Sequence, residues 1–178
     1  MRVLVHICCA PCFAHPHHRL LELGHEVVGF WYNPNIHPTL EYRARRDAVE
    51  RYAELEDVEV VYGYYPLFDY VEAAVAAMRE GRRCEACYEH RLKAAFDHAR
   101  QEGFDAVTTT LLVSHQQKHQ AVRDVGERLS DEYGVPFLYE DFREGWERGR
   151  AIATQYGLYR QKYCGCLFSE WERYRNLL

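Results

Sequence analysis

The sequence predicts a single α/β domain with a five-stranded, mostly parallel sheet flanked by helices and a helical C-terminal part. Short runs rich in valine and aromatic residues alternate with segments long enough for helices, and no low-complexity linker interrupts them. Such alternation is typical of βαβ units, and a length of 178 residues suits one domain. We expect the sheet core over residues 1–140 and the helical segment over residues 141–178.

Each expected element follows from a local pattern. The apolar and β-branched runs predict strands over residues 3–7, 26–32, 58–62, 106–110 and 135–139. Helices are expected over residues 15–23, 40–55, 70–79, 85–102 and 116–133, and the first of them is closed by Gly24. Residues 145–178 are expected to be helical with one interruption.

The composition narrows the functional class. Hydrophobic residues make up 48% of the chain and charged residues 28%, as in ordinary globular proteins. No apolar run approaches the roughly 20 residues of a membrane span, and the N-terminus is too short and polar for a signal peptide. We therefore expect a cytoplasmic protein that does not associate with membranes. The net charge of −5 argues against a wholly basic nucleic-acid-binding surface but allows a local basic patch.

The chain has seven cysteines, and in a reducing compartment they indicate metal binding or redox chemistry rather than a disulfide framework. Cys8, Cys9 and Cys12 directly follow the first expected strand. Cys84 and Cys87 lie three residues apart at the start of an expected helix. Both places belong to the carboxyl edge of a parallel sheet, where ligands bind. We expect the two groups to meet in space.

The surroundings of these cysteines favour thiolates, because helix N-termini and nearby arginines lower thiol pKa values. Zinc and iron–sulfur clusters both accept four thiolate ligands, and the spacing does not distinguish them. A third group, Cys164-Gly165-Cys166, has alternate cysteines. Such a pair can form a strained, easily reduced disulfide, although two further metal ligands or two ordinary thiols fit the same pattern.

Several segments together resemble the cobalamin-independent epoxyqueuosine reductases (QueH), along nearly the whole chain. The most distinctive are Cys8-Cys9-Ala10-Pro11-Cys12 and the run from Leu158 to Cys166. The other matching segments are Tyr32 to Pro38, Glu41-Tyr42 with Arg45, Arg83 to Tyr88 with Arg91-Leu92, Thr108 to Leu112, Ser114, Lys118, Asp141-Phe142-Arg143 and Ser169. One segment departs from the family pattern: Ser114-His115-Gln116-Gln117-Lys118 stands where Ser-Pro-Tyr-Lys is expected.

The resemblance implies a HUP/Rossmann-like fold and the reduction of epoxyqueuosine to queuosine at the wobble position of tRNA. It implies that Cys8, Cys9, Cys84 and Cys87 bind a [4Fe–4S] cluster and that Cys164 and Cys166 form a redox-active disulfide. An additional iron ion is expected to use Cys12 and a carboxylate such as Asp141. The partners would be tRNA carrying epoxyqueuosine and an electron donor of unknown identity. Candidate contacts to the nucleic acid are Arg45, Lys118, Arg143, Tyr159, Arg160 and Lys162.

Two other functions stay open. One is a zinc- or cluster-binding tRNA-thiolating enzyme of the ATP-cleaving α/β type. Such enzymes carry a phosphate-binding Ser-Gly-Gly-x-Asp-Ser loop after the first strand, where this chain has the Cys-Cys-Ala-Pro-Cys run, and Pro11 offers no N–H to a phosphate. The other is a non-catalytic zinc adaptor, which would be colourless.

Overall fold

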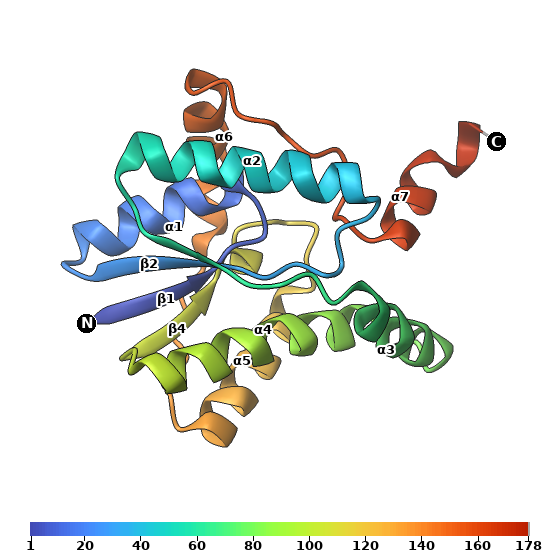
Figure 1. Cartoon of the computed structure of the whole chain (residues 1–178), viewed down its shortest axis with the longest axis horizontal. Helices are drawn as coiled ribbons and strands as arrows, with labels where there is room; N and C mark the ends of the chain where they lie inside the picture. The colour runs from blue at the N-terminus through green and yellow to red at the C-terminus, as the bar shows by residue number, and fades with distance from the viewer. Residues whose placement is uncertain (178) are drawn as a thin grey trace.

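A four-stranded parallel sheet forms the centre of the computed structural model, which describes residues 1–177 (Figure 1). The strands are β1 (Arg2–His6), β2 (Glu26–Trp31), β3 (Val60–Tyr62) and β4 (Ala106–Thr109), in the order β3-β2-β1-β4. The central strand β1 places Leu4 opposite Val28 of β2 and opposite Val107 of β4. The α/β class and the parallel sheet are therefore confirmed.

The prediction of a fifth strand over residues 135–139 is wrong. This segment makes one isolated parallel bridge, between Val107 and Phe137, with hydrogen bonds from Val107 N to Pro136 O (2.9 Å) and from Leu138 N to Val107 O (2.8 Å). Pro136 has no N–H to donate. The N–H of Tyr139 bonds back to the Phe137 carbonyl oxygen, so the chain turns away before a second pair can form.

Helices cover both faces of the sheet, and Figure 1 shows α1, α2 and α6 on one side and α4 and α5 on the other. Their bounds are α1 (Ala10–Glu22), α2 (Thr39–Glu56), α3 (Leu67–Arg79), α4 (Arg83–Glu102), α5 (His119–Tyr133), α6 (Trp146–Gln155) and α7 (Leu167–Tyr174). Short 3₁₀ turns are η1 (Thr110–Leu112), η2 (Phe142–Gly145) and η3 (Arg175–Leu177). None of the helices within residues 1–177 combines the length and apolarity that crossing a membrane requires.

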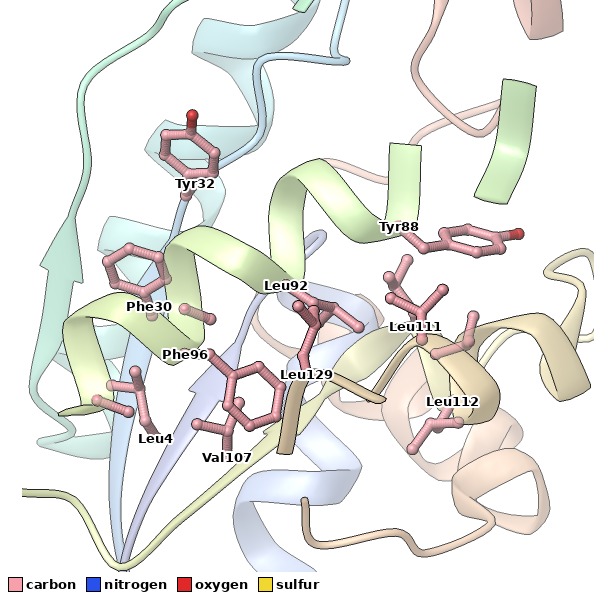
Figure 2. Packing of buried hydrophobic residues seen from close by; sticks show 14 of the residues in the cluster. Leu4, Phe30, Tyr32, Tyr88, Leu92, Phe96, Val107, Leu111, Leu112 and Leu129 are labelled. Atoms are coloured by element: carbon pink, nitrogen blue, oxygen red, sulfur yellow. The ribbon is translucent and has the colours of Figure 1, made fainter. Parts of the chain in front are cut away.

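The two faces have separate apolar cores because side chains alternate along a strand. Val3, Val5 and Ile7 of the first strand region pack under α1 and α2. Leu4 packs on the opposite face with α4 and α5. Figure 2 shows Leu92 and Phe96 of α4 lying over Leu4 and Val107 of the sheet. The middle of α4 is thereby fixed against the sheet, and this sets where the N-terminus of the helix lies.

The first and last helical regions differ from the sequence prediction. Helix α1 begins at Ala10 rather than at residue 15, so Cys12 lies in its first turn. The C-terminal part has the expected interruption, which covers residues 156–166 and separates α6 from α7. Helix α6 packs closely on α1: a Cβ at Gly149 would lie 2.3 Å from the Pro11 carbonyl oxygen. Glycine at this position lets α6 approach the cysteine-rich turn.

Candidate thiol and metal site

The turn after β1 gathers three sulfur atoms. Cys9 is the N-cap residue of α1, with extended backbone, and Pro11 occupies the first turn of the helix, where its missing N–H has no partner to lose. The Sγ atoms of Cys8, Cys9 and Cys12 all lie within 4.8 Å of one another, and Cys8 Sγ is 3.8 Å from Cys9 Sγ. Cys9 and Cys12 are buried and Cys8 is half-buried. No imidazole or carboxylate of residues 1–177 joins this group within that limit.

The three thiols differ in their pKa values. Hydrogen bonds from Cys12 and Cys9 lower the pKa of Cys8 well below its ordinary value, and Thr110 and the Arg91 guanidinium lower it further. Burial raises the pKa of Cys9, and the hydrogen bonds with Cys8 and Cys9 raise that of Cys12. Cys8 is therefore the favoured thiolate. A bound metal would supply the charge that lets the other thiols ionise as well.

The N-terminus of α4 supplies the second pair of cysteines. Cys84 is half-buried and Cys87 is buried, one turn further along the helix. Arg91 follows Cys87 after four residues, so it lies on the same face of the helix. Burial raises the pKa of Cys87, and the Arg91 guanidinium opposes that effect. Cys84 also lines an open pocket of about 180 Å³ with Met78, Gly81, Arg83 and Lys118.

Arg91 connects the two groups. Its side chain is 1% exposed, and its Nη2 donates to Asn33 Oδ1 at 2.6 Å. Asn33 in turn donates from Nδ2 to the carbonyl oxygen of Ile7, the residue before Cys8. The guanidinium is close enough to both Cys8 and Cys87 to lower their pKa values. Both groups therefore lie near the same buried cation, while Cys84 and Cys87 stay outside the three-sulfur group of Cys8, Cys9 and Cys12.

The Cys164-Gly165-Cys166 segment lies at the same edge of the sheet, just before α7 (Figure 1). Gly165 has a φ of 138°, which side-chain-bearing residues rarely adopt. Its carbonyl oxygen accepts a hydrogen bond from His37 N at 2.8 Å. All seven cysteines are free thiols in this structure. The segment is therefore held by its backbone, and no disulfide joins its two sulfurs in the part of the chain that the structure describes.

Amide side chains bond directly to the sulfurs. Gln161 Nε2 donates to Cys9 Sγ at 2.8 Å, and Gln117 Nε2 donates to Cys164 Sγ at 3.3 Å. Cys166 Sγ accepts from Ser169 N at 3.4 Å, as the N-cap of α7. The C-terminal segment thus contacts the cysteine-rich turn through Gln161, and Gln117 connects it to the loop before α5.

The expected nucleic-acid contacts have different surroundings. Arg45 is 2% exposed, pairs with Glu41 through Nε (2.7 Å) and donates to the carbonyl oxygens of Cys164 (2.9 Å) and Tyr163 (3.0 Å). This corrects the expectation of a surface role, because every part of its fork is engaged inside the protein. Lys118, Arg160 and Lys162 are exposed, and none of them forms an ion pair with another residue in the range 1–177. The Tyr159 hydroxyl donates to Glu41.

Asp141 and Arg143 form an ion pair with each other. Arg143 Nε lies 2.8 Å and 3.1 Å from the two carboxylate oxygens, and the Asp141 side chain also caps η2. The hydrogen bonds from Arg143 outweigh burial and lower the pKa of Asp141 to about 2. The carboxylate is ionised but occupied, and it is not part of the three-sulfur group.

Sequence reasoning did not single out Asn33, Gln117 or Gln161 as site residues. Each bonds to a partner between 26 and 152 positions away. The available signal was position: Asn33 and Gln161 lie inside the two conspicuous runs that begin at Tyr32 and Leu158. From the sequence alone, a neutral amide in such a run cannot be told from an ordinary surface residue, because its partner is distant in the chain.

The family model described as "Epoxyqueuosine reductase QueH" matches residues 3–172. A protein of that name from Dehalococcoides mccartyi is 37% identical over 174 residues, which cover 97% of this chain and 94% of that protein. A namesake from Thermotoga maritima is 36% identical over 181 residues, covering 96% of this chain and 91% of that protein.

A solved structure described as a predicted subunit of tRNA methyltransferase, from Methanocaldococcus jannaschii, superposes with a TM-score of 0.55 at 12% identity. The match covers 85% of this chain and 74% of that one, and it shows a shared fold alone. The family assignment depends instead on the sequence relatives, which match along more than nine-tenths of both chains. Together with the model match over residues 3–172, they show that this chain belongs to the epoxyqueuosine reductase QueH family.

Proposed function

We propose that this protein reduces epoxyqueuosine to queuosine in tRNA, and that its cysteines hold the electrons for the reaction. The observation that carries the proposal is the gathering of three cysteine groups at one sheet edge, around the buried Arg91 guanidinium, in a chain of this family. Conversion of the epoxide to the alkene consumes two electrons and two protons and releases the oxygen as water.

Cys8, Cys9, Cys84 and Cys87 are the proposed ligands of a [4Fe–4S] cluster. The donor set fits: the ligand atoms available are thiols, which soft thiophilic metals and iron–sulfur clusters select. Four cysteines from two helix N-termini match the number that such a cluster needs. When bound, the cluster supplies single-electron transfer at a potential tuned by burial, charge and hydrogen bonds to sulfur.

Cys164 and Cys166 are the proposed store of reducing equivalents. Oxidation of the two thiols to a disulfide releases two electrons and two protons, which balances the epoxide reduction. An external donor then reduces the disulfide. Burial raises the pKa of Cys164 to about 11, and the hydrogen bond from Gln117 opposes that effect. Ser169 N donates to Cys166 Sγ. Arg45 orients the segment through its backbone.

The exposed cations near this edge are proposed to bind the tRNA backbone. Lys118 lines the pocket at Cys84, together with the half-buried Arg83, which pairs with Glu172. Arg160 and Lys162 lie on the segment that leads to Cys164. Tyr159, which is 40% exposed, offers a ring on which an unstacked base can lie. Arg143 joins this surface through its half-exposed guanidinium. Phosphate binding at these positions needs only a local positive patch, which a net charge of −5 permits.

An additional iron ion would use Cys12, whose sulfur lies beside those of Cys8 and Cys9. Asp141 is the carboxylate proposed as its partner, and it would have to exchange its hydrogen bonds with Arg143 for the metal. If this ion binds, the iron count per chain should exceed that of the cluster. Cys12→Ser and Asp141→Asn should each remove the excess iron.

The first test is anaerobic purification with iron, sulfide and zinc counted per chain, followed by incubation with epoxyqueuosine-containing tRNA and dithionite. We expect about four iron and four sulfide per chain together with conversion to queuosine. Cys84→Ser and Cys87→Ser should lose iron, and Cys164→Ser should keep it. Stoichiometric zinc with no conversion would contradict the proposal and return the protein to the zinc-adaptor class. ATP-dependent thiolation of the tRNA would favour the ATP-cleaving class instead.

A further inference from the structure

Two arginines are buried near the cysteines, and within residues 1–177 only Arg45 has a carboxylate partner. Arg45 is 2% exposed and its Nε lies 2.7 Å from Glu41 Oε1. Arg91 is 1% exposed and forms no ion pair with any residue of the range 1–177. Its hydrogen bond goes to the neutral amide oxygen of Asn33 at 2.6 Å. The two side chains look equivalent in burial but differ in how their charge is balanced.

Among residues 1–177, the Nε–H of Arg91 has no acceptor. A guanidinium stays protonated in a protein, so this charge cannot be removed by losing a proton. A buried charge without a countercharge is strongly destabilising. The fold tolerates Arg91 at this position only if other groups nearby carry negative charge.

Thiols are the acidic groups that act most strongly on the Arg91 guanidinium. Burial alone would lower its pKa, but Cys87, Cys8 and Cys164 raise it overall. These three residues represent all three cysteine groups: the start of α4, the turn after β1 and the segment before α7. The orientation of the guanidinium is set by Asn33, which is itself fixed to the Ile7 carbonyl oxygen.

We propose that Arg91 is a positioning residue whose charge balances the thiolate ligands of the iron–sulfur site and thereby raises the reduction potential of that site. The inference rests on the proposed function. A cluster held by four thiolates is an anion, and reduction adds one further negative charge. A cation fixed beside it stabilises the reduced form more than the oxidised form. Because Arg91 is buried, water and salt screen this effect little.

The test compares three variants after anaerobic reconstitution. Arg91→Gln removes the charge, Arg91→Lys keeps it, and Arg100→Gln makes the same change at an exposed position of the same helix. Iron and sulfide are counted, and the midpoint potential is measured by titration with dithionite and mediators, followed by visible absorbance and EPR. We expect Arg91→Gln to lower the midpoint potential by at least about 59 mV. For one electron this is a tenfold change in the ratio of reduced to oxidised cluster. Arg91→Lys and Arg100→Gln should stay near the wild-type value.

The outcomes separate the two proposals. Arg91→Gln with wild-type iron content and wild-type potential would overturn the role of Arg91 and leave the proposed function intact. A wild-type chain without any cluster would overturn both. If circular dichroism shows that Arg91→Gln does not fold, the charge-conserving variant decides: Arg91→Lys at the wild-type potential supports the proposal. A folded Arg91→Lys that loses its iron or shifts its potential tenfold overturns it, because the charge is still present.

Discussion

Arg45 donates from Nη1 to the carbonyl oxygen of Cys164 at 2.9 Å, although 119 positions separate the two residues in the chain. Its other amino group donates to the carbonyl oxygen of Tyr163, and its Nε pairs with Glu41. One buried fork on α2 therefore fixes the backbone of the segment that carries the proposed dithiol. Arg45 bonds to backbone carbonyl oxygens and not to sulfur, so it leaves the two thiols available for reaction.

Arg45→Lys should loosen this segment. Lysine keeps the charge opposite Glu41 but cannot bond both carbonyl oxygens with a planar fork. We expect a loss of about 1–3 kcal/mol in the free energy of unfolding, because a buried acceptor is left unpaired. Residues 158–166 should also become more sensitive to limited proteolysis. Arg46→Lys is the matched control, since its pair with Glu50 is 42% exposed at the arginine; equal effects at both positions would contradict this role for Arg45.

Cys164→Ser should separate electron storage from metal binding. A single remaining thiol cannot form the disulfide with Cys166, so multiple turnover should fall to background while iron content stays normal. Cys84→Ser is the contrasting variant and should lose iron. Turnover is measured as queuosine formed per chain with dithionite as reductant. Full multiple-turnover activity in Cys164→Ser would rule out the dithiol as the electron store.

Gly149→Ala should push α6 away from α1 and so disturb the cysteine-rich turn at the start of α1. The added Cβ would lie 2.3 Å from the Pro11 carbonyl oxygen, which is backbone and cannot rotate away. We expect a destabilisation of about 1–3 kcal/mol from overpacking and a lower iron content after reconstitution. Arg150→Ala, at a half-exposed position of the same helix, is the control. A Gly149→Ala protein with unchanged stability would show that α6 can move away from α1 at little cost.

His17 should make stability depend on pH. It is 2% exposed, its Nδ1 lies 2.9 Å from the Tyr52 hydroxyl, and burial lowers its pKa from 6.5 to about 4. Between these two values the unfolded chain binds a proton that the folded chain does not, so stability falls as the pH drops through this window. The contribution is about 2 kcal/mol between pH 7 and pH 5.

Urea unfolding of the wild type and of His17→Asn at pH 7 and pH 5 measures this contribution. The variant should lose about 2 kcal/mol less than the wild type over the same interval. His115→Asn, at an exposed position, should behave like the wild type. Parallel losses in wild type and His17→Asn would mean that other groups carry the pH dependence.

Lys118→Ala should weaken tRNA binding without regard to sequence. Lys118 is exposed beside Cys84, and a lysine that contacts one phosphate contributes about one unit to the slope of log affinity against log salt. The measurement is the dissociation constant for epoxyqueuosine-containing tRNA at several salt concentrations. Lys93→Ala is the control, because Lys93 lies further along α4 and faces Glu132. An unchanged slope in Lys118→Ala would place the phosphate path elsewhere.

Local patterns in the sequence determined most of the sheet and the placement of the cysteines. Four of the five expected strands form, because each is an apolar run whose residues pack on both faces of a parallel sheet. The fifth run has similar composition, yet it makes one bridge at Phe137. The missing N–H of Pro136 and the early turn at Tyr139 limit its pairing, and that outcome depends on where β4 stops.

Only the tertiary structure decided which charges belong to the site. Arg45 and Arg91 each follow a possible partner by four residues on a helix, Glu41 in one case and Cys87 in the other. No local pattern indicates that both become buried. Nor does one indicate that Arg45 bonds to the backbone at Tyr163 and Cys164, while Arg91 has no carboxylate partner within residues 1–177. Periodicity determines which face of a helix is apolar, but contacts between residues 58 to 119 positions apart depend on how the layers pack. Such contacts set the charge balance around the thiols.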